Sequence, residues 1–180
     1  PSYAIRDARY GPYAENTMDI SLPEGRTQES AVIVLVYGGA WTGGDKGDFS
    51  FLREYFCDRG FAAFSVNYRL ARVEGTGLKN ILDDMDNAVA FIRGESGRRT
   101  YSRDLIFLAG HSAGGHITLL YSFTRAPAGA IRGVVSFCGL ADLTDPELVK
   151  SVNRMEERQT AAGKPFDRIG FLTGPDKNMR

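Results

Sequence analysis

The sequence has few of the residues that mark disulfide-built, metal-binding or nucleic-acid-binding proteins. Its 180 residues include two cysteines and two histidines, and 22 acidic residues balance 22 basic ones. Two distant cysteines do not build a disulfide framework, so we expect Cys57 and Cys138 to be buried free thiols. A net charge of zero argues against a nucleic-acid partner or a role at a membrane surface, which usually need a basic excess. Nothing in the sequence resembles a metal site.

Long apolar runs are also missing, and no segment approaches the length of a membrane span. No signal peptide is visible, which slightly favours a cytoplasmic location, but the first residue is not methionine, so the compartment stays open. Repeats, low-complexity tracts and linkers are absent from the sequence. We therefore expect residues 1–180 to belong to one domain with a sizeable core.

Apolar strands alternate with amphipathic helices along the chain. The predicted strands are 31–37, 61–68, 105–109 and 131–138, after a short edge strand or hairpin within 10–22. The predicted helices are 49–59, 78–93, one that follows the elbow described below, and one that opens at Asp145-Pro146. Asp48 is the expected cap of the first helix, and Gly94 is expected to end the second. This alternation indicates right-handed βαβ units and an α/β architecture with a doubly wound, mostly parallel sheet.

The most informative segment follows the strand 105–109. Gly110-His111-Ser112-Ala113-Gly114 fits the G-x-S-x-G pattern, and a helix-compatible run comes after it. A strand, a sharp glycine turn, a serine and a helix make up a nucleophile elbow. Glycine lacks a Cβ, so Gly110 and Gly114 let the chain turn tightly and let the helix pack against the strand. Ser112 would then stand at the turn as the nucleophile.

A glycine-rich loop after the strand 31–37 complements this serine. Attack on an ester or amide carbonyl creates an oxyanion, which preorganised backbone N–H groups must stabilise. In a nucleophile-elbow architecture one donor follows the nucleophile and the others lie in the loop after the third strand. Ala113, Gly39 and Ala40 occupy these positions and form the candidate oxyanion hole. Trp41 is interpreted as a packing anchor for this loop.

The sequence lacks an evident base for the serine. A serine nucleophile almost always needs a histidine, but His111 and His116 both lie inside the elbow segment. His111 is interpreted as shaping the turn. His116 is interpreted as a packing residue, because a base one helical turn after Ser112 would be badly aimed. Asp142 is a candidate acid, with a structural or loop-capping role as the alternative.

Four motifs occur in a characteristic order. They are Tyr37–Trp41 with Gly44–Lys46, Asn67–Leu70, Gly110–Gly115 and Gly139–Leu143. Together they resemble the α/β-hydrolase carboxylesterases and lipases, in particular the hormone-sensitive-lipase-like esterases and the kynurenine formamidases. Tyr37 stands where that family usually has a histidine, which is mainly structural there. The resemblance implies an α/β-hydrolase fold and a reaction without a cofactor.

The resemblance also implies parts that this sequence lacks. The family has a further strand that ends in a catalytic Asp and then another strand followed by a catalytic His, and neither is recognisable here. We therefore expect the N-terminal two-thirds of an α/β-hydrolase domain, without the last strands and helices. Such a chain should be nearly inactive by itself, and its exposed sheet edge should favour self-association.

The predicted function is hydrolysis of small carboxylic esters by a nucleophilic serine and an oxyanion hole. The substrate would be a small-molecule ester or amide. Two alternatives stay open: an aryl formamide hydrolase, and a non-catalytic binding module of hydrolase-like fold, since no triad histidine is present. A histidine supplied by a second chain would also complete the site.

Overall fold

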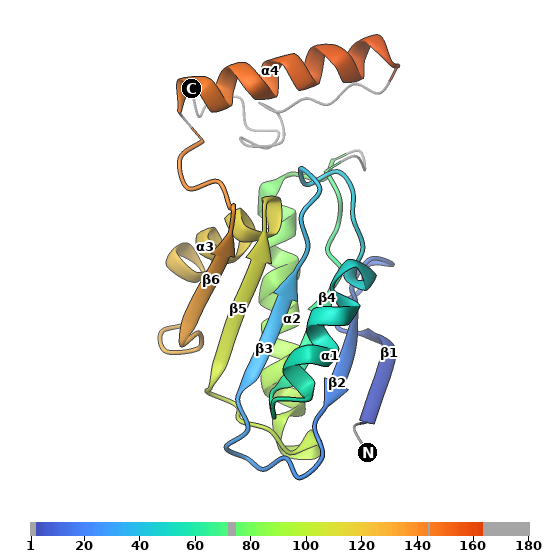
Figure 1. Ribbon diagram of the computed structural model, residues 1–180, viewed down its shortest axis with the longest axis vertical. Helices are drawn as coiled ribbons and strands as arrows, with labels where there is room; N and C mark the ends of the chain where they lie inside the picture. The colour runs from blue at the N-terminus through green and yellow to red at the C-terminus, as the bar shows by residue number, and fades with distance from the viewer. Residues whose placement is uncertain (1–2, 72–74, 144, 164–180) are drawn as a thin grey trace.

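Six strands form one mixed sheet in the order β1-β2-β4-β3-β5-β6 (Figure 1). The structure is a computed structural model that describes residues 3–71, 75–143 and 145–163. The strands are β1 (Tyr3–Arg9), β2 (Thr17–Leu22), β3 (Val32–Val36), β4 (Ala62–Val66), β5 (Ile106–His111) and β6 (Gly133–Phe137). The helices are η1 (Lys46–Phe49), α1 (Ser50–Cys57), α2 (Leu78–Arg99), α3 (Ala113–Thr124) and α4 (Pro146–Ala161).

The sheet is parallel from β4 to β6 and antiparallel at its other edge. Strands β4, β3, β5 and β6 run in one direction, whereas β1 and β2 form a hairpin whose second strand pairs antiparallel with β4. Helix α1 covers one face, and helices α2 and α3 cover the other (Figure 1). The predicted doubly wound, mostly parallel α/β sheet is therefore confirmed, and the hairpin predicted within 10–22 includes the earlier strand β1.

Strand β3 is buried on both faces, which explains its uninterrupted apolar sequence. Successive side chains of a strand point to opposite faces. Val32, Val34 and Val36 thus join the cluster that α2 and α3 cover, while Ile33 and Leu35 join the smaller cluster beneath α1. A strand flanked by helices on both sides needs apolar residues at every position, as the parallel sheets of α/β proteins do.

Helix α2 continues beyond Gly94, so the predicted end of this helix was wrong. The helix reaches Arg99 and ends at Thr100, whose φ of 61° is left-handed. A glycine inside a helix costs only about 1 kcal/mol relative to alanine. The last turns gain an ion pair between Glu95 and Arg99 at 2.7 Å and a buried Ser96. These contacts offset the weak preference of glycine for the helix.

The prediction that Asp48 caps the helix over 49–59 was also wrong, because a short helix, η1, precedes α1. Asp45 begins η1, and its carboxylate accepts a hydrogen bond from the Gly47 amide at 2.8 Å. Asp48 instead accepts a hydrogen bond from the Asp45 amide at 3.1 Å, as the reciprocal partner of a capping box. Helix α1 then starts at Ser50 without a side-chain cap.

The two cysteines differ from each other in exposure. Both are free; Cys57 is buried, as predicted, but Cys138 is exposed. Cys138 directly follows β6, where a φ of 51° turns the chain out of the sheet. Because β6 is the outermost strand among the described residues, no neighbouring strand covers this turn.

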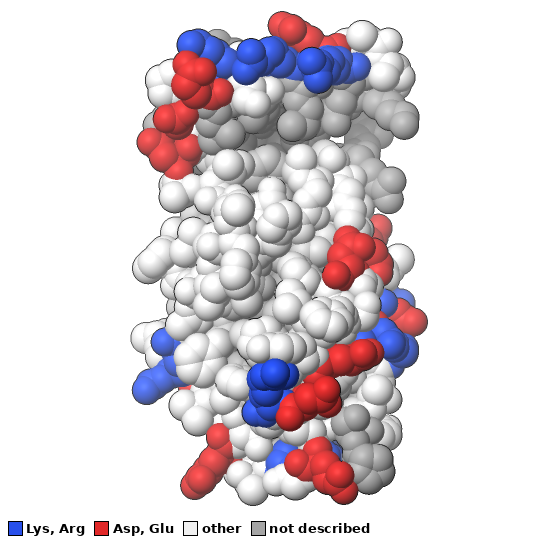
Figure 2. All heavy atoms as spheres, in the orientation of Figure 1, with Lys and Arg blue, Asp and Glu red and all other residues white. Residues whose placement is uncertain are grey.

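The outer strand β6 presents apolar side chains to solvent. Val135 is 46% exposed and Phe137 is 52% exposed. Both alternate with Ser136, whose hydroxyl faces Gly115 of α3, so they point to the opposite face of the sheet. Figure 2 shows this face as an expanse with few charged side chains, in the orientation where β5 and β6 face the viewer.

Among the described helices, none is long and apolar enough to cross a membrane.

A buried ion pair fastens the loop after β4 to helix α2. Asp84 is fully buried, and its carboxylate accepts hydrogen bonds from the Arg69 amide at 2.8 Å and from the Arg69 guanidinium at 2.9–3.0 Å. Arg69 also donates to the Asn80 carbonyl at 2.8 Å, and its guanidinium lies over the Tyr13 ring at 3.8 Å. This pairing satisfies two charges that would be costly to bury separately.

Removing Asp84 should leave the Arg69 guanidinium buried without its carboxylate. We expect Asp84→Ala to lower the free energy of unfolding by about 3–5 kcal/mol. The matched control is Lys79→Ala, which removes a solvent-exposed ion pair with Asp83 on the same helix and should cost less than about 1 kcal/mol. Urea denaturation followed by circular dichroism measures both changes. Similar small losses in the two variants would contradict the role given to the buried pair.

Candidate functional site

Ser112 lies in the sharp turn between β5 and α3. Its backbone has φ 52° and ψ −119°, a conformation that costs a non-glycine residue on the order of 1–3 kcal/mol. Two hydrogen bonds hold the turn: the Ser112 amide donates to the Phe137 carbonyl at 2.8 Å, and the His116 amide donates to the Ser112 carbonyl at 3.0 Å. The side chain is half-buried, and its hydroxyl has no hydrogen bond to any residue that the structure describes.

The turn is possible because glycines let backbone segments meet. A Cβ on Gly114 would lie 2.1 Å from the Val36 carbonyl oxygen and 2.4 Å from that of Tyr37. A Cβ on Gly38 would lie 2.7 Å from the His111 carbonyl oxygen and 3.0 Å from the Ser112 Cβ. Helix α3 therefore packs directly on the end of β3, and the loop that follows β3 lies against the elbow.

This loop holds three successive residues in left-handed backbone conformations. The φ angles are 112° at Gly39, 50° at Ala40 and 61° at Trp41. The Gly39 carbonyl accepts hydrogen bonds from the Thr42 and Gly43 amides, each at 3.0 Å. Within the described part of the chain, the amides of Gly39, Ala40 and Ala113 donate no hydrogen bond. The structure thus brings the predicted donors to the same end of the strands as Ser112, and their N–H groups have no acceptor among the described residues.

The second motif, Asn67–Leu70, supports the base of this loop. Asn67 accepts a hydrogen bond from the Lys46 amide at 2.7 Å and donates to the Asp45 carboxylate at 3.0 Å. Tyr68 stacks on Tyr37 with ring centroids 4.6 Å apart and donates to the Tyr37 carbonyl at 3.0 Å. Tyr37 is thus a buried structural residue, as the resemblance implies. Sequence reasoning identified the motif but not these contacts, since they join segments far apart in the chain.

Lys46 lies in a network of charges beside the loop. Its ammonium group is 2.8 Å from the Asp7 carboxylate and 3.2 Å from that of Asp19. Burial alone would raise the pKa of Asp19, but hydrogen bonds from the Asp7 amide, Arg6 and Lys46 hold it below its ordinary value. Asp19 is therefore an ionised anchor for Lys46 and gives the end of the loop a fixed position.

The two histidines occupy different environments. His111 is exposed, while His116 is 6% exposed and meets the Trp41 ring edge-to-face, with centroids 5.5 Å apart. Burial lowers the pKa of His116, and its Nδ1 has no hydrogen-bond partner. Neither imidazole is hydrogen-bonded to the Ser112 hydroxyl; the His116 bond to Ser112 is between backbone groups. Trp41 is buried, which fits its predicted packing role.

Asp142 follows β6 and has an exposed side chain. The hydrogen bond between Ser112 and Phe137 brings the end of β6 beside the elbow. Asp142 therefore follows a strand whose carboxyl end lies next to Ser112. Its role as the acid stays a prediction.

Across the described ranges, no group of three or more His, Cys, Asp or Glu residues is arranged to hold a metal ion.

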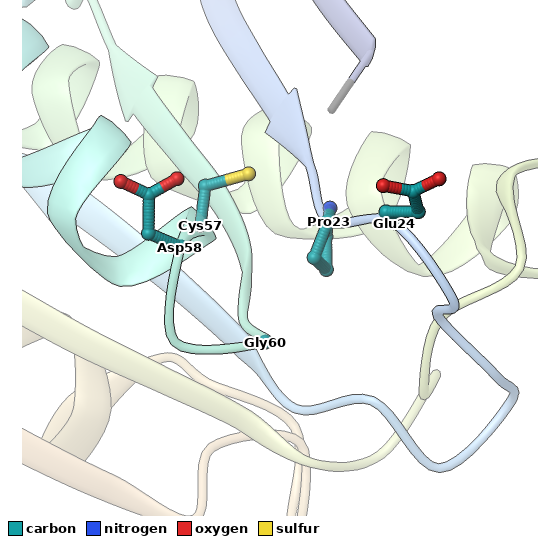
Figure 3. Close-up of a pocket in the computed structure, with 5 residues that line it drawn as sticks. All are labelled: Pro23, Glu24, Cys57, Asp58 and Gly60. Carbon is teal, nitrogen blue, oxygen red and sulfur yellow. The ribbon is translucent and has the colours of Figure 1, made fainter. Parts of the chain in front are cut away.

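A hollow of about 290 Å³ lies at the end of the strands opposite to Ser112. It is lined by Pro23, Glu24, Cys57, Asp58 and Gly60 (Figure 3). These residues follow β2 and α1 and precede β4, whereas Ser112 follows the carboxyl end of β5. The hollow is therefore separate from the candidate site.

The sheet order, the strained serine turn and the adjoining glycine loop agree with a match to a known family. The BD-FAE family model matches residues 18–168. The chain belongs to the BD-FAE family, a family of α/β-hydrolases. The predicted α/β-hydrolase resemblance is thus confirmed, and the match covers both the elbow and the glycine-rich loop.

Curated relatives of this BD-FAE chain carry esterase names. A "probable isoprenylcysteine alpha-carbonyl methylesterase" from Oryza sativa subsp. japonica is 32% identical over 123 residues, which are 67% of this chain and 28% of that protein. The "probable carboxylic ester hydrolase LipM" of Mycobacterium tuberculosis is 28% identical over 173 residues, 85% of this chain and 40% of LipM. The chain therefore spans less than half the length of these two relatives.

Solved structures share the fold of the BD-FAE chain. Esterase B from Lactobacillus rhamnosis superposes with a TM-score of 0.74 at 22% identity, over 97% of this chain and 58% of that chain. An esterase from Thermogutta terrifontis gives a TM-score of 0.66 at 21% identity, over 86% of this chain and 60% of that chain. At this identity the likeness establishes the α/β-hydrolase fold.

The contact of Gly114 with β3 generates a prediction for stability. In Gly114→Ala the new Cβ would meet backbone oxygens that cannot move aside, so we expect a loss of several kcal/mol, on the order of 2–4. Gly94→Ala is the matched control, because a Cβ there meets open space inside helix α2 and should stabilise the chain by about 0.5–1 kcal/mol. Thermal unfolding compares the two. A Gly114→Ala variant as stable as the parent would show that the close packing is not required.

Proposed function

We propose that this chain carries the nucleophile and the oxyanion hole of a carboxylic ester hydrolase, with Ser112 as the nucleophile. The observation that carries the proposal is the strained turn at Ser112, placed against a second strained loop with free N–H groups. Strain of this kind persists only where the surrounding structure enforces it, and it is concentrated at functional sites. The esterase names of the relatives support an ester as the substrate.

The reaction follows from the geometry of the elbow. The Ser112 Oγ attacks the ester carbonyl carbon, the carbonyl π electrons move to its oxygen, and the hydroxyl proton passes to a base. The amides of Gly39, Ala40 and Ala113 stabilise the oxyanion, assisted by the positive amino-terminal end of helix α3. The alcohol leaves with the proton. Water then attacks the acyl-enzyme by the same route and releases the carboxylic acid.

We propose that the base of this reaction is neither His111 nor His116. His116 is committed to a buried contact with Trp41, and His111 is exposed beside the turn. Asp142 is proposed as the acid that would orient such a base, because it follows β6 at the same sheet edge. A second chain that supplies the histidine would serve the same role.

Labelling of the serine tests the proposed function directly. A fluorophosphonate probe reacts with activated serines, and we expect slow labelling of this chain that is abolished in Ser112→Ala. The matched control is Ser122→Ala, a serine on the same helix whose hydroxyl donates to the Thr118 carbonyl at 2.7 Å. Labelling of a folded Ser112→Ala variant at the parent rate would refute the assignment. An absence of labelling in the folded parent would instead favour the binding-module alternative.

We also propose that the exposed edge at β6 promotes self-association. An unpaired strand offers a row of N–H and C=O groups to another chain, and apolar side chains beside it strengthen the contact. Val135 and Phe137 supply such side chains, and the face around them carries few charges (Figure 2). Native edge strands avoid pairing by carrying charged residues, lysine above all.

A charge at the edge should therefore reduce association. We expect Val135→Lys to shift the sedimentation profile toward the monomer at protein concentrations where the parent forms larger species. Phe123→Lys is the control, because Phe123 is 82% exposed but lies on helix α3. An equal effect of both substitutions would point to general solubility rather than to β6.

A further inference from the structure

One side-chain contact joins the loop after β3 to the helix that follows Ser112. Trp41 comes directly after Ala40 in the loop, and His116 lies in the first turn of α3. Their rings meet at 88° with centroids 5.5 Å apart, and both side chains are buried. The two elements supply the proposed oxyanion donors, Ala40 from the loop and Ala113 from the helix. The contact therefore links the two elements that carry the proposed donors.

The loop needs such a restraint because its backbone is strained. Ala40 and Trp41 both have positive φ angles, a conformation that is unfavourable for a residue with a side chain. Hydrogen bonds from Thr42 and Gly43 to Gly39 act within the loop, and the Ala71 amide binds the Trp41 carbonyl at 2.8 Å from the other side. None of these three hydrogen bonds connects the loop to α3. The Trp41 ring makes that connection through His116.

His116 is an unusual residue for a position that only fills space. Its Nδ1 is buried without a hydrogen-bond partner, which is unfavourable relative to a polar group that is hydrogen-bonded. An aliphatic residue would fill the same volume without that cost. A flat polarisable ring, however, gives the edge-to-face contact that aromatic pairs prefer. The choice of histidine thus fits an interaction with the Trp41 ring.

We propose that His116 is a positioning residue that holds Trp41, and through it the Ala40 amide, in register with the Ala113 amide. This inference rests on the proposed function of the site, in which those amides face the oxyanion. His116 does not touch the reacting atoms; it fixes the distance between two donors carried by separate elements. Misplacement of catalytic groups by about 1 Å can slow a reaction about a hundredfold.

Fluorescence tests the contact without any need for catalysis. Trp41 is the single tryptophan of the sequence, so its emission reports on this loop alone. Protonated imidazole quenches tryptophan, and burial lowers the pKa of His116, so emission from the parent should fall as the pH decreases through a midpoint below the ordinary histidine range. We expect that step to disappear in His116→Phe and to persist in the control His111→Gln. Persistence of the step in a folded His116→Phe variant overturns the contact.

Labelling kinetics then test the positioning role. His116→Ala should slow fluorophosphonate labelling of Ser112 about tenfold to a hundredfold and make Trp41 more accessible to acrylamide, while His116→Phe, which keeps an aromatic ring, should restore both toward the parent values. If His116→Ala does not fold, His116→Phe still tests the proposal. Loss of labelling in a folded His116→Phe variant in which Trp41 stays inaccessible to acrylamide would contradict positioning by the ring. Unchanged labelling and quenching in a folded His116→Ala variant overturn the proposal. If the parent itself is not labelled, the proposed function fails, but the fluorescence result still decides the Trp41 contact.

Discussion

The close approach of helix α3 to the end of β3 is the constraint on which the candidate site depends. Gly114 lies so near the Val36 and Tyr37 carbonyls that no side chain fits between them. This approach sets the start of the helix directly beside the loop that leaves β3. The strained backbone of Ser112 is the geometric result, because the chain must reverse from β5 into a helix that cannot stand further away. The geometry of the proposed site therefore depends on backbone packing.

The surrounding motifs act as supports for that packing. Asn67 holds the turn at Asp45, Tyr68 stacks beneath Tyr37, and Arg69 is bound to Asp84 of α2. Three consecutive residues thus tie the loop after β4 to three different segments. These long-range contacts restrain the loop after β3 in addition to the hydrogen bonds within the loop. It also explains why polar residues are buried here: each is matched by a specific partner.

Much of the fold could be predicted from the sequence, because buried parallel strands and amphipathic helices leave strong local patterns. Strands β3, β4 and β6 lie within the predicted ranges, and the serine turn was evident from its glycines. Strand β5 runs to His111, past the end predicted at residue 109. The failures came where tertiary contacts outweighed local preference. Helix α2 continues through Gly94, Asp45 caps η1 while α1 has no side-chain cap, and Cys138 is exposed after an edge strand. The Trp41–His116 contact has no sequence signal, since it depends on how the loop after β3 meets the distant helix α3.

The strand order also fixes the sequence of events during synthesis. Strand β3 lies between β4 and β5, so one of its sides pairs with a strand that is made much later. The loop with the proposed oxyanion donors leaves the ribosome well before the serine turn does. Until β5 is synthesised, the edge of β3 that later pairs with β5 stays exposed to water and to other chains. This topology therefore leaves β3 exposed to aggregation during that interval, since non-local parallel pairing is slow and prone to aggregation.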